Sequence, residues 1–251
     1  MEKTDKKCSV VLSQRLTALT RMVTPGSTVA DVGCDHGFVP IYLVQNGIAP
    51  HVVAMDLRKG PLAGANEHIA SCGLSAYIET RLSDGLTAFV PGEAKTLICA
   101  GMGGRLMQQI LAQYPEKTAS FRELILQPQS VLWEFRVFLR ESGINVVDED
   151  ILCEDGKYYF LMKAVPSGMA PEETEVNLQR LYDKYGRFLL ERKHPVLQKY
   201  LEKELQNCLK VEEKLLERER LDGFTKKRAE SLAQTRQEIA DLRRALDFWR
   251  E

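Results

Sequence analysis

The 251-residue sequence has no long hydrophobic run and almost no net charge. No stretch of about 18 consecutive apolar residues occurs, which excludes a transmembrane helix. The polar residues 1–7 are not followed by an apolar segment, so we expect no signal peptide and a cytoplasmic protein. The net charge of −1 predicts no polyanionic partner by itself. A nucleic-acid partner would therefore require a local basic patch.

Paired cysteines are also lacking. The six cysteines form no CxxC motif and are Cys8, Cys34, Cys72, Cys99, Cys153 and Cys208. Zinc sites and disulfide frameworks depend on paired spacings, so we expect neither a metal site nor disulfides. The thiols are interpreted as small buried side chains in a reducing compartment.

The first two thirds of the sequence alternate short β-branched runs with helix-length segments. Strands are expected at 28–32, 51–55, 77–80, 96–99, 124–126, 145–151 and 158–164. Strands separated by helices predict βαβ units and a parallel sheet. The close spacing of the last two predicts an antiparallel edge, with Asp155 in its tight turn. We therefore expect an α/β domain at residues 1–165.

After Pro166 the composition changes to Glu, Lys, Arg and Leu. Apolar residues then recur at spacings of three, four or seven, as in Leu232, Ile239, Leu242, Leu246 and Trp249. This spacing is typical of a coiled-coil seam. "LDGF" at 221–224 predicts a turn between two helices. We expect an all-α domain at 166–251, whose coiled coil could close within one chain or join two chains, so the oligomeric state stays open.

The stretch "ADVGCDHGFVP" at residues 30–40 joins the first predicted strand to the next helix. Ligands of open α/β sheets bind at such strand ends. A dinucleotide fingerprint needs a central glycine for the backbone to approach a pyrophosphate, but Asp35 holds that position and would repel phosphate. A cofactor with cationic groups fits better, and S-adenosylmethionine carries a sulfonium and an ammonium. A nicotinamide-dependent dehydrogenase is correspondingly disfavoured.

Three further predicted strands end in residues that suit the same cofactor. Asp56 closes "HVVAMD" and can accept hydrogen bonds from both ribose hydroxyls. "SDG" at 83–85 offers an acid for the amino group of an adenine and a glycine that leaves room for the ring. "CAGMGG" at 99–104 is a turn of small residues where the backbone can approach a ligand closely. Four compatible strand ends together favour S-adenosylmethionine.

Five segments together resemble the bacterial TrmK family of tRNA (adenine-22-N1)-methyltransferases. They are "LSQRL" (12–16), "ADVGCDHGFVPIYL" (30–43), "SDGL" (83–86), "AGMGG" (100–104) and "LILQPQ" (124–129). The resemblance covers most of the chain and implies a Rossmann-like class I S-adenosylmethionine-dependent methyltransferase domain with a C-terminal coiled-coil domain. It also implies methylation of N1 of an adenine in the D-loop region of tRNA.

The resemblance further implies which residues contact the cofactor. They are Asp31, Gly33, Cys34, Asp35, His36, Asp56, Leu57, Ser83, Asp84, Gly85, Ala100, Gly101 and Met102. Many amino-methyltransferases carry an Asn-Pro-Pro-Tyr clamp where this chain has residues 100–102. Its absence fits a ring-nitrogen acceptor.

Adenine N1 has an in-plane lone pair and can attack the methyl carbon directly once aligned, so positioning is the main catalytic task. The product is a cation, and a group that accepts a hydrogen bond from N6 and later takes a proton would help. His36 is the first candidate because the ordinary pKa of histidine suits proton transfer near neutrality, and Asp31 is the second. His36 could instead act as a helix cap.

Arg15 in "LSQRL" is a candidate phosphate contact, or an ordinary charge on an amphipathic helix. Lys226, Lys227 and Arg228 form the local basic run that we single out for tRNA contact. Two alternative functions stay open at this point. One is a methyltransferase acting on another RNA or a small molecule. The other is a non-catalytic nucleotide-binding module whose coiled coil recruits a protein.

Overall fold

The structure, a computed structural model, describes residues 8–168, 174–222 and 225–250. The chain divides into two compact units, Met1–Glu173 and Thr174–Glu251. The composition change in the sequence predicts a boundary slightly earlier, after residue 165, and those domain limits stay a prediction. No helix within the described ranges is long and apolar enough to cross a membrane.

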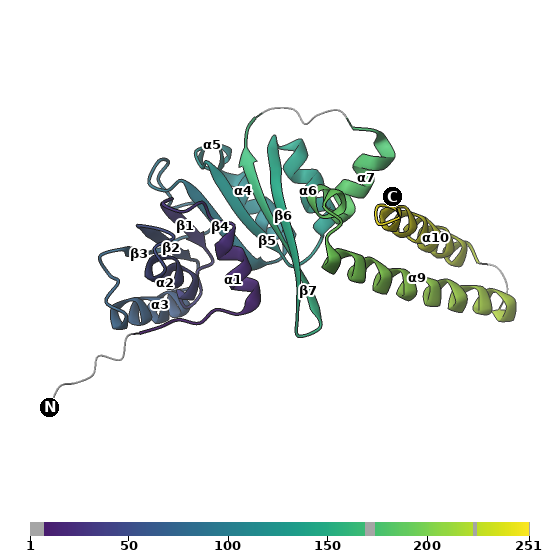
Figure 1. Ribbon diagram of the computed structural model, residues 1–251, viewed down its shortest axis with the longest axis horizontal. Helices are drawn as coiled ribbons and strands as arrows, with labels where there is room; N and C mark the ends of the chain where they lie inside the picture. Colours follow the sequence, from purple (N-terminus) through teal and green to yellow (C-terminus); the bar gives the residue numbers. More distant parts are fainter. Residues whose placement is uncertain (1–7, 169–173, 223–224, 251) are drawn as a thin grey trace. The chain divides into compact units, whose positions relative to one another are not determined.

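A seven-stranded sheet forms the centre of the first unit, in the order β3-β2-β1-β4-β5-β7-β6 (Figure 1). Its strands are β1 (Val29–Val32), β2 (Val52–Asp56), β3 (Ile78–Leu82), β4 (Thr96–Met102), β5 (Glu123–Pro128), β6 (Ile144–Glu154) and β7 (Lys157–Pro166). The first five pair in parallel, and β7 pairs antiparallel with β5 and β6. Both the predicted parallel sheet and its antiparallel edge are confirmed. Asp155 lies in the β6–β7 turn, with a positive φ of 51°.

Helices cover both faces of this sheet. α1 (Gln14–Arg21), α2 (Phe38–Gln45) and α3 (Lys59–Ser71) pack on one face, and α4 (Gly104–Gln113) and α6 (Leu132–Glu141) pack on the other, with the short α5 (Pro115–Ala119) after α4. Two neighbouring residues of β1 show why helices cover both faces. Val29 and Ala30 belong to different apolar clusters because alternate side chains of a strand point to opposite faces. A strand buried on both faces is therefore mostly apolar, and the buried Asp31 is the exception in β1.

The strand order reverses between β1 and β4. From β1 the chain adds β2 and β3 on one side and then returns to place β4 on the other side. Loops leaving the two strands thus run in opposite directions, which opens a crevice at their carboxyl ends. This edge of the sheet is where the predicted strand-end residues lie.

The second unit is all-α and contains α7 (Val176–Tyr185), α8 (Arg187–Glu191), α9 (Pro195–Asp222) and α10 (Lys226–Asp247). α9 and α10 lie side by side (Figure 1), and Arg236 Nε of α10 donates to Glu212 Oε1 of α9 at 2.7 Å. The helical nature of the tail is confirmed, whereas the coiled coil stays a prediction. Half of the "LDGF" turn, residues 223 and 224, lies outside the described residues.

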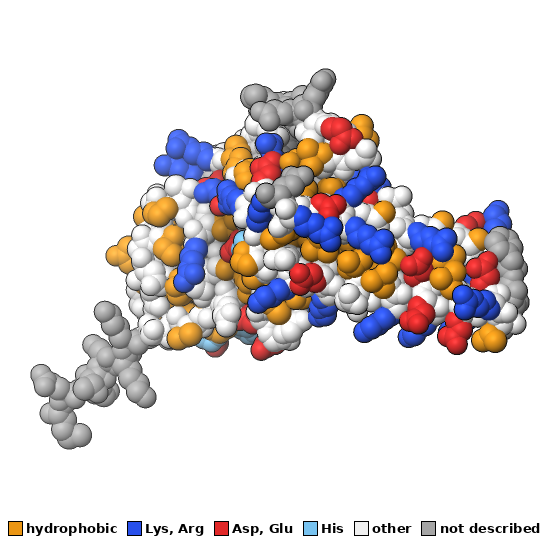
Figure 2. Space-filling model, turned by 45° about the vertical axis from the view of Figure 1, so that its right-hand side comes forward, with side chains coloured by type: hydrophobic (Ala, Val, Ile, Leu, Met, Phe, Trp, Pro, Cys, Tyr) orange, Lys and Arg blue, Asp and Glu red, His pale blue; other side chains and the backbone are white. Residues whose placement is uncertain are grey.

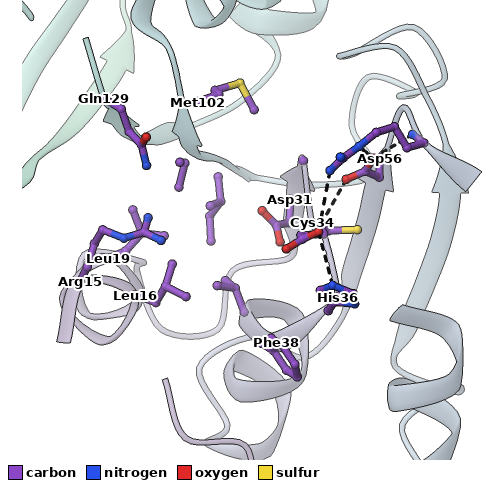
Figure 3. Close-up of a pocket in the computed structure, with 17 residues that line it drawn as sticks. Arg15, Leu16, Leu19, Asp31, Cys34, His36, Phe38, Asp56, Met102 and Gln129 are labelled. Atoms are coloured by element: carbon purple, nitrogen blue, oxygen red, sulfur yellow. Dashed lines mark hydrogen bonds and ion pairs between the residues drawn. The ribbon is translucent and has the colours of Figure 1, made fainter. Parts of the chain in front are cut away.

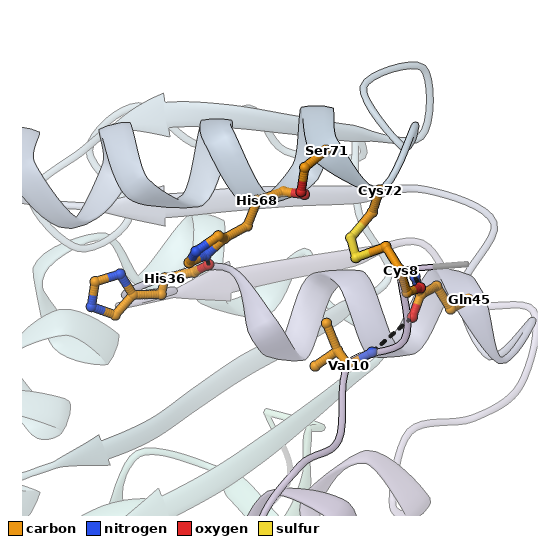
Figure 4. Close-up of a disulfide and its surroundings, with 7 residues drawn as sticks. All are labelled: Cys8, Val10, His36, Gln45, His68, Ser71 and Cys72. Carbon is orange, nitrogen blue, oxygen red and sulfur yellow. Dashed lines mark hydrogen bonds between the residues drawn. A yellow bond between two sulfur atoms is a disulfide. The ribbon is translucent and has the colours of Figure 1, made fainter. Parts of the chain in front are cut away.

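One expectation about the cysteines is wrong. Cys8 and Cys72 form a disulfide, although 64 residues separate them in the sequence (Figure 4). Gln45 of α2 holds the segment before α1 in place, because its Nε2 donates to Cys8 O and its Oε1 accepts from Val10 N. Cys72 follows the last turn of α3. The two thiols meet because the N-terminal segment crosses the ends of two helices, which cysteine spacing alone does not reveal.

The other four cysteines are free. Cys34 and Cys99 are buried, as expected, whereas Cys153 is exposed and Cys208 is half-buried. The expectation that all six are buried thiols is therefore correct for two of them.

Candidate functional site

A pocket of about 370 Å³ opens at the carboxyl ends of β1 and β4 (Figure 3). Its volume is in the range of sites that hold small ligands. The candidate residues that line it are Arg15, Asp31, Gly33, Cys34, Asp35, His36, Asp56, Ala100, Gly101 and Met102. The structure brings these residues together because the carboxyl ends of parallel strands share one edge of the sheet.

The loop between β1 and α2 forms one wall of the pocket. The N–H groups of Gly33 and Cys34 both donate to Met55 O of β2, at 2.8 and 3.0 Å. Gly33 has a φ of 80°, and a Cβ at this position would lie 3.0 Å from Met102 Cε. A side chain here would therefore be strained and would press on the opposite wall.

Asp31 points a buried carboxylate toward this pocket. It is 5% exposed, and none of the residues described by the structure donates a hydrogen bond to its side chain. Burial, and secondarily the charge of Asp56, raise the pKa of Asp31 to about 7. A buried carboxylate without a donor favours a cationic ligand.

Asp56 is held by the backbone of its neighbours. Its Oδ2 accepts from Asp35 N at 3.2 Å, and its Oδ1 accepts from Arg58 N at 2.8 Å. Arg58 Nε lies 3.7 Å from the same Oδ1. Each carboxylate oxygen can accept a further bond, so Asp56 can still receive hydrogen bonds from ligand hydroxyls.

Four predicted cofactor residues do not line this pocket: Leu57, Ser83, Asp84 and Gly85. The turn after β3 is nevertheless tied to the end of β2, because Ser83 N donates to Asp56 O at 2.9 Å. Ser83 Oγ also donates to Gly85 O at 2.8 Å. Leu57 is 62% exposed, an unusual state for a leucine directly after a buried strand. The Ser83–Gly85 turn therefore continues the polar edge beyond Asp56.

His36 lies on the α3 side of the pocket, away from Gln129 (Figure 3). A Cβ added to Gly64 of α3 would lie 3.0 Å from His36 Nδ1, so the ring packs against that helix. Its Nε2 is 3.8 Å from Asp35 Oδ1. His36 O is bonded to His68 Nδ1 at 3.0 Å. These contacts place the imidazole beside the loop and α3.

Arg15 reaches the opposite side of the pocket from α1. The start of this helix is fixed by the β6–β7 hairpin, because Glu154 Oε1 accepts from Gln14 N at 2.6 Å. The Arg15 guanidinium lies 5.4 Å from the centre of the Tyr159 ring, within the range of cation–π contact. Arg15 is thus oriented by two elements outside its own helix.

Gln127 supports the pocket from β5 and is not among the candidate residues predicted from the sequence. Its side chain is fully buried in β5, and its Oε1 accepts from Arg15 Nη1 at 2.7 Å and from Gly101 N at 3.1 Å. One amide oxygen therefore fixes both the guanidinium and the turn after β4. A glutamine inside the apolar run "LILQP" was the available signal, because buried polar groups are normally hydrogen-bonded.

Other lining residues were also missed: Leu16, Leu19, Phe38, Val39, Arg58, Ile98 and Gln129. Most are apolar and belong to helix or strand cores in the sequence pattern, so no chemical signal marks them.

The basic run belongs to the second unit, in the first turn of α10. Lys226 and Lys227 are exposed, and Arg228 Nη1 donates to Arg218 O of α9 at 2.9 Å. Arg228 therefore also joins the two helices. Among the described residues, no group of three or more His, Cys, Asp or Glu side chains could hold a metal ion.

The "AGMGG" turn depends on Gly104, the first residue of α4. A Cβ at Gly104 would lie 2.4 Å from Ser130 O and 2.9 Å from Val131 Cγ2. We expect Gly104→Ala to lower the free energy of unfolding by about 3 kcal/mol, because the chain after β5 must move. Gly60→Ala is the matched control, since nothing lies within 4 Å of its Cβ position. Urea unfolding of both variants tests this, and equal losses would contradict the steric argument.

Residues 12–162 match the methyltransferase-domain family. The reversal of strand order, the glycine-containing loop and the acidic pocket, together with this match, define a methyltransferase of Rossmann-like fold. The tRNA (adenine(22)-N(1))-methyltransferase of Bacillus subtilis is 32% identical over 204 residues, which span 81% of this chain and 85% of the relative. The chain belongs to the family of tRNA (adenine(22)-N(1))-methyltransferases.

Solved structures agree with this assignment. The B. subtilis m1A22 tRNA methyltransferase TrmK superposes with a TM-score of 0.81 at 28% identity, covering 95% of this chain and 100% of that chain. A Streptococcus pneumoniae protein proposed to be a tRNA (m1A22) methyltransferase was solved in complex with S-adenosyl-L-methionine. It superposes with a TM-score of 0.80 at 28% identity, covering 94% of this chain and 100% of that chain. At these coverages both alignments include most of the helical tail.

Proposed function

We propose that this protein transfers the methyl group of S-adenosylmethionine to N1 of adenine 22 in tRNA. The observation that carries the proposal is the pair of buried carboxylates, Asp31 and Asp56, at the β1–β4 reversal in a member of this family. The predicted activity on tRNA and the predicted cofactor agree with the relatives.

The cofactor supplies an electrophilic methyl group on a sulfonium centre. The buried carboxylate of Asp31 has no donor among the described residues and suits the cationic part of this molecule. Asp56 would accept from the ribose hydroxyls, as its free lone pairs allow. The exposed Leu57 and the Ser83–Gly85 turn are our candidates for the adenine end.

Methylation of N1 requires that the adenine be unpaired and turned into the site, at a cost of roughly a few kcal/mol. The turn at Gly101 and Met102 lies at the end of β4 and is our candidate for the place where the base meets the methyl group. The remaining catalytic work is alignment of N1 with the methyl carbon. Fixed elements around the turn, above all Gln127, suit that task.

His36 and Asp31 stay our candidates for taking up a proton from the product. The packing of His36 against α3 favours a role in holding the cofactor loop. We expect His36→Ala to weaken cofactor binding about tenfold and to leave the single-turnover rate at saturating cofactor within about threefold of wild type. Calorimetry and rapid-quench kinetics separate the two quantities. A rate loss of about 100-fold with normal cofactor affinity would assign His36 to the chemistry instead.

We further propose that Arg15 contacts phosphate and that Lys226, Lys227 and Arg228 contact the tRNA body. On the face shown in Figure 2, acidic and basic side chains are interspersed along the C-terminal helices. A mixed surface gives little long-range attraction, so individual contacts would have to hold the RNA. Since tRNA is the substrate, we also propose that the protein acts in the cytoplasm.

The test is incubation of the purified protein with unmodified tRNA transcripts and methyl-labelled S-adenosylmethionine, followed by nucleoside analysis. We expect labelled N1-methyladenosine in transcripts with adenine 22 and none when guanine replaces it. Label in another nucleoside would support a different RNA acceptor. Cofactor binding without transfer to any RNA would contradict the proposed activity and revive the non-catalytic alternative.

A further inference from the structure

Gln129 stands at the end of β5, on the same side of the pocket as Arg15 and opposite His36 and Asp56 (Figure 3). Its backbone is fixed to the neighbouring strand, because Gln129 N donates to Met102 O at 3.0 Å. Its side-chain amide makes no hydrogen bond to any residue that the structure describes. The backbone of Gln129 is therefore fixed, while its side-chain NH₂ donor and oxygen acceptor are both available to a ligand.

The amide lies directly over the turn where we place the acceptor base. A Cβ added to Gly101 would be 3.9 Å from Gln129 Nε2 and 3.7 Å from Arg15 Nη1. Arg15 can only donate hydrogen bonds, and one of its donors is already bound to Gln127. Of the two polar side chains within 4 Å of this Cβ position, Gln129 alone can both donate and accept.

We propose that Gln129 selects adenine by reading its N6–N7 edge, an inference that rests on the proposed function. When N1 is directed at the methyl group, the adjacent 6-amino group and N7 form the neighbouring edge of the ring. The amide oxygen of Gln129 accepts from N6, and its NH₂ donates to N7, the two-bond pairing that glutamine makes with adenine. Guanine presents O6 in place of the amino group, which would face the amide oxygen. Pyrimidines have no N7.

The test uses tRNA joined from synthetic pieces with adenine or 7-deazaadenine at position 22. N1 is present in both, but the second base lacks the N7 acceptor. We expect the single-turnover rate of the wild type at saturating cofactor to fall about tenfold with 7-deazaadenine. Gln129→Ala should be about tenfold slower than wild type on adenine and should show no further loss with 7-deazaadenine. Adenine and 7-deazaadenine can differ in the intrinsic reactivity of N1. Comparing the adenine-to-7-deazaadenine rate ratio of the variant with that of the wild type cancels this difference.

Gln129→Glu gives a second, isosteric test. A carboxylate can still accept from N6 but repels the lone pair of N7, so this variant should be faster on 7-deazaadenine than on adenine. Gln113→Ala, an exposed glutamine of α4 outside the pocket, is the matched control and should keep the wild-type ratio. Circular dichroism and urea unfolding should match the wild type in all three variants, because the Gln129 amide makes no hydrogen bond to any described residue, and this verifies that they fold.

Two outcomes separate this inference from the proposed function. If the wild type methylates adenine 22 and Gln129→Ala retains the wild-type ratio between the two bases, base selection by Gln129 is wrong while the activity stands. If the wild type transfers no methyl group to the unmodified base at all, the proposed function itself fails.

Discussion

Between about pH 5.5 and pH 7, the affinity of the protein for S-adenosylmethionine is expected to rise by up to about tenfold per pH unit, and Asp31→Asn is expected to abolish this rise. The pKa of Asp31 is about 7 in the protein without ligand, chiefly because the carboxylate is buried and secondarily because Asp56 lies close by. A cationic ligand favours the ionised form and lowers this pKa. Binding below pH 7 must therefore release a proton.

Calorimetry in two buffers of different ionisation enthalpy measures this release directly. We expect the wild type to release close to one proton per cofactor bound at about pH 6. In Asp31→Asn this residue has no proton to release. The variant should also bind about 10-fold to 100-fold more weakly at pH 8, where the wild-type carboxylate is ionised. A variant that retains the wild-type pH dependence would show that Asp31 does not face the cation.

The same pKa makes an opposite prediction for stability without cofactor. The folded pKa of Asp31 exceeds the unfolded value of 3.8, so the folded protein binds more protons between those two values. Its stability should therefore fall as the pH rises from about 4 to about 7, by up to about 4 kcal/mol, and should level off above the folded pKa. Asp31→Asn removes the buried charge and should raise the melting temperature of the cofactor-free protein at pH 8.

Asp35→Asn is the matched control for the effect on stability. Asp35 lies in the same loop, but its side chain is 62% exposed. Its φ of 49° is also tolerated by asparagine. The control should leave the stability of the cofactor-free protein unchanged. If only Asp31→Asn gains stability, and it also loses affinity for the cofactor, then the buried Asp31 carboxylate destabilises the fold and is needed for cofactor binding.

The residues at strand ends could be predicted from the sequence because two local rules determine them. A short apolar run followed by an acid or glycine marks a buried parallel strand and its carboxyl end. Parallel strands then bring such ends to one edge, so Asp31, Asp56 and Gly101 fall in one pocket without further information. Placing these strand-end residues in one pocket therefore requires little knowledge of how the helices pack.

The opposite wall could not be predicted in this way. Arg15 precedes β5 by more than a hundred residues, and its bond to Gln127 depends on the position of α1, whose first residue is bonded to Glu154 of β6. Gln129 differs from an ordinary loop glutamine only by the fixed position of its backbone. The Cys8–Cys72 pair has the same origin, since it reflects how helices meet. These features depend on tertiary contacts that no local pattern encodes.

The second unit contains a further feature of this kind, a buried ionic cluster between α7 and α10. Asp241 of α10 is 1% exposed, and its Oδ2 accepts from Arg180 Nε at 2.9 Å and from Lys184 Nζ at 2.7 Å. Gln237 Nε2 donates to the other oxygen at 2.9 Å. Burial alone would raise the pKa of Asp241, but the hydrogen bonds from Lys184 and Arg180 outweigh it and hold that pKa below its usual value.

Asp241→Ala is expected to lower the free energy of unfolding of the second unit by about 3–5 kcal/mol, because the Lys184 ammonium, only 5% exposed, loses the buried carboxylate of Asp241. Asp247→Ala, on the same helix, should cost less than about 0.5 kcal/mol, since its ion pair with Arg250 is exposed. Hydrogen exchange of peptides from α7 and α10 measures both changes. Similar protection in the two variants would contradict the role of the cluster.

The pH dependence of this effect has the reverse sign to that of Asp31. Because the folded pKa of Asp241 is depressed, its contribution is fully present above the unfolded value of 3.8 and is lost as the pH falls through the folded pKa. The difference in hydrogen exchange between wild type and Asp241→Ala should therefore shrink in acid.

At pH 7 the Asp241→Ala variant should keep its affinity for S-adenosylmethionine, whose candidate residues all lie in the first unit, and lose affinity for tRNA. Loss of cofactor binding as well would mean that the first unit depends on the second for its fold.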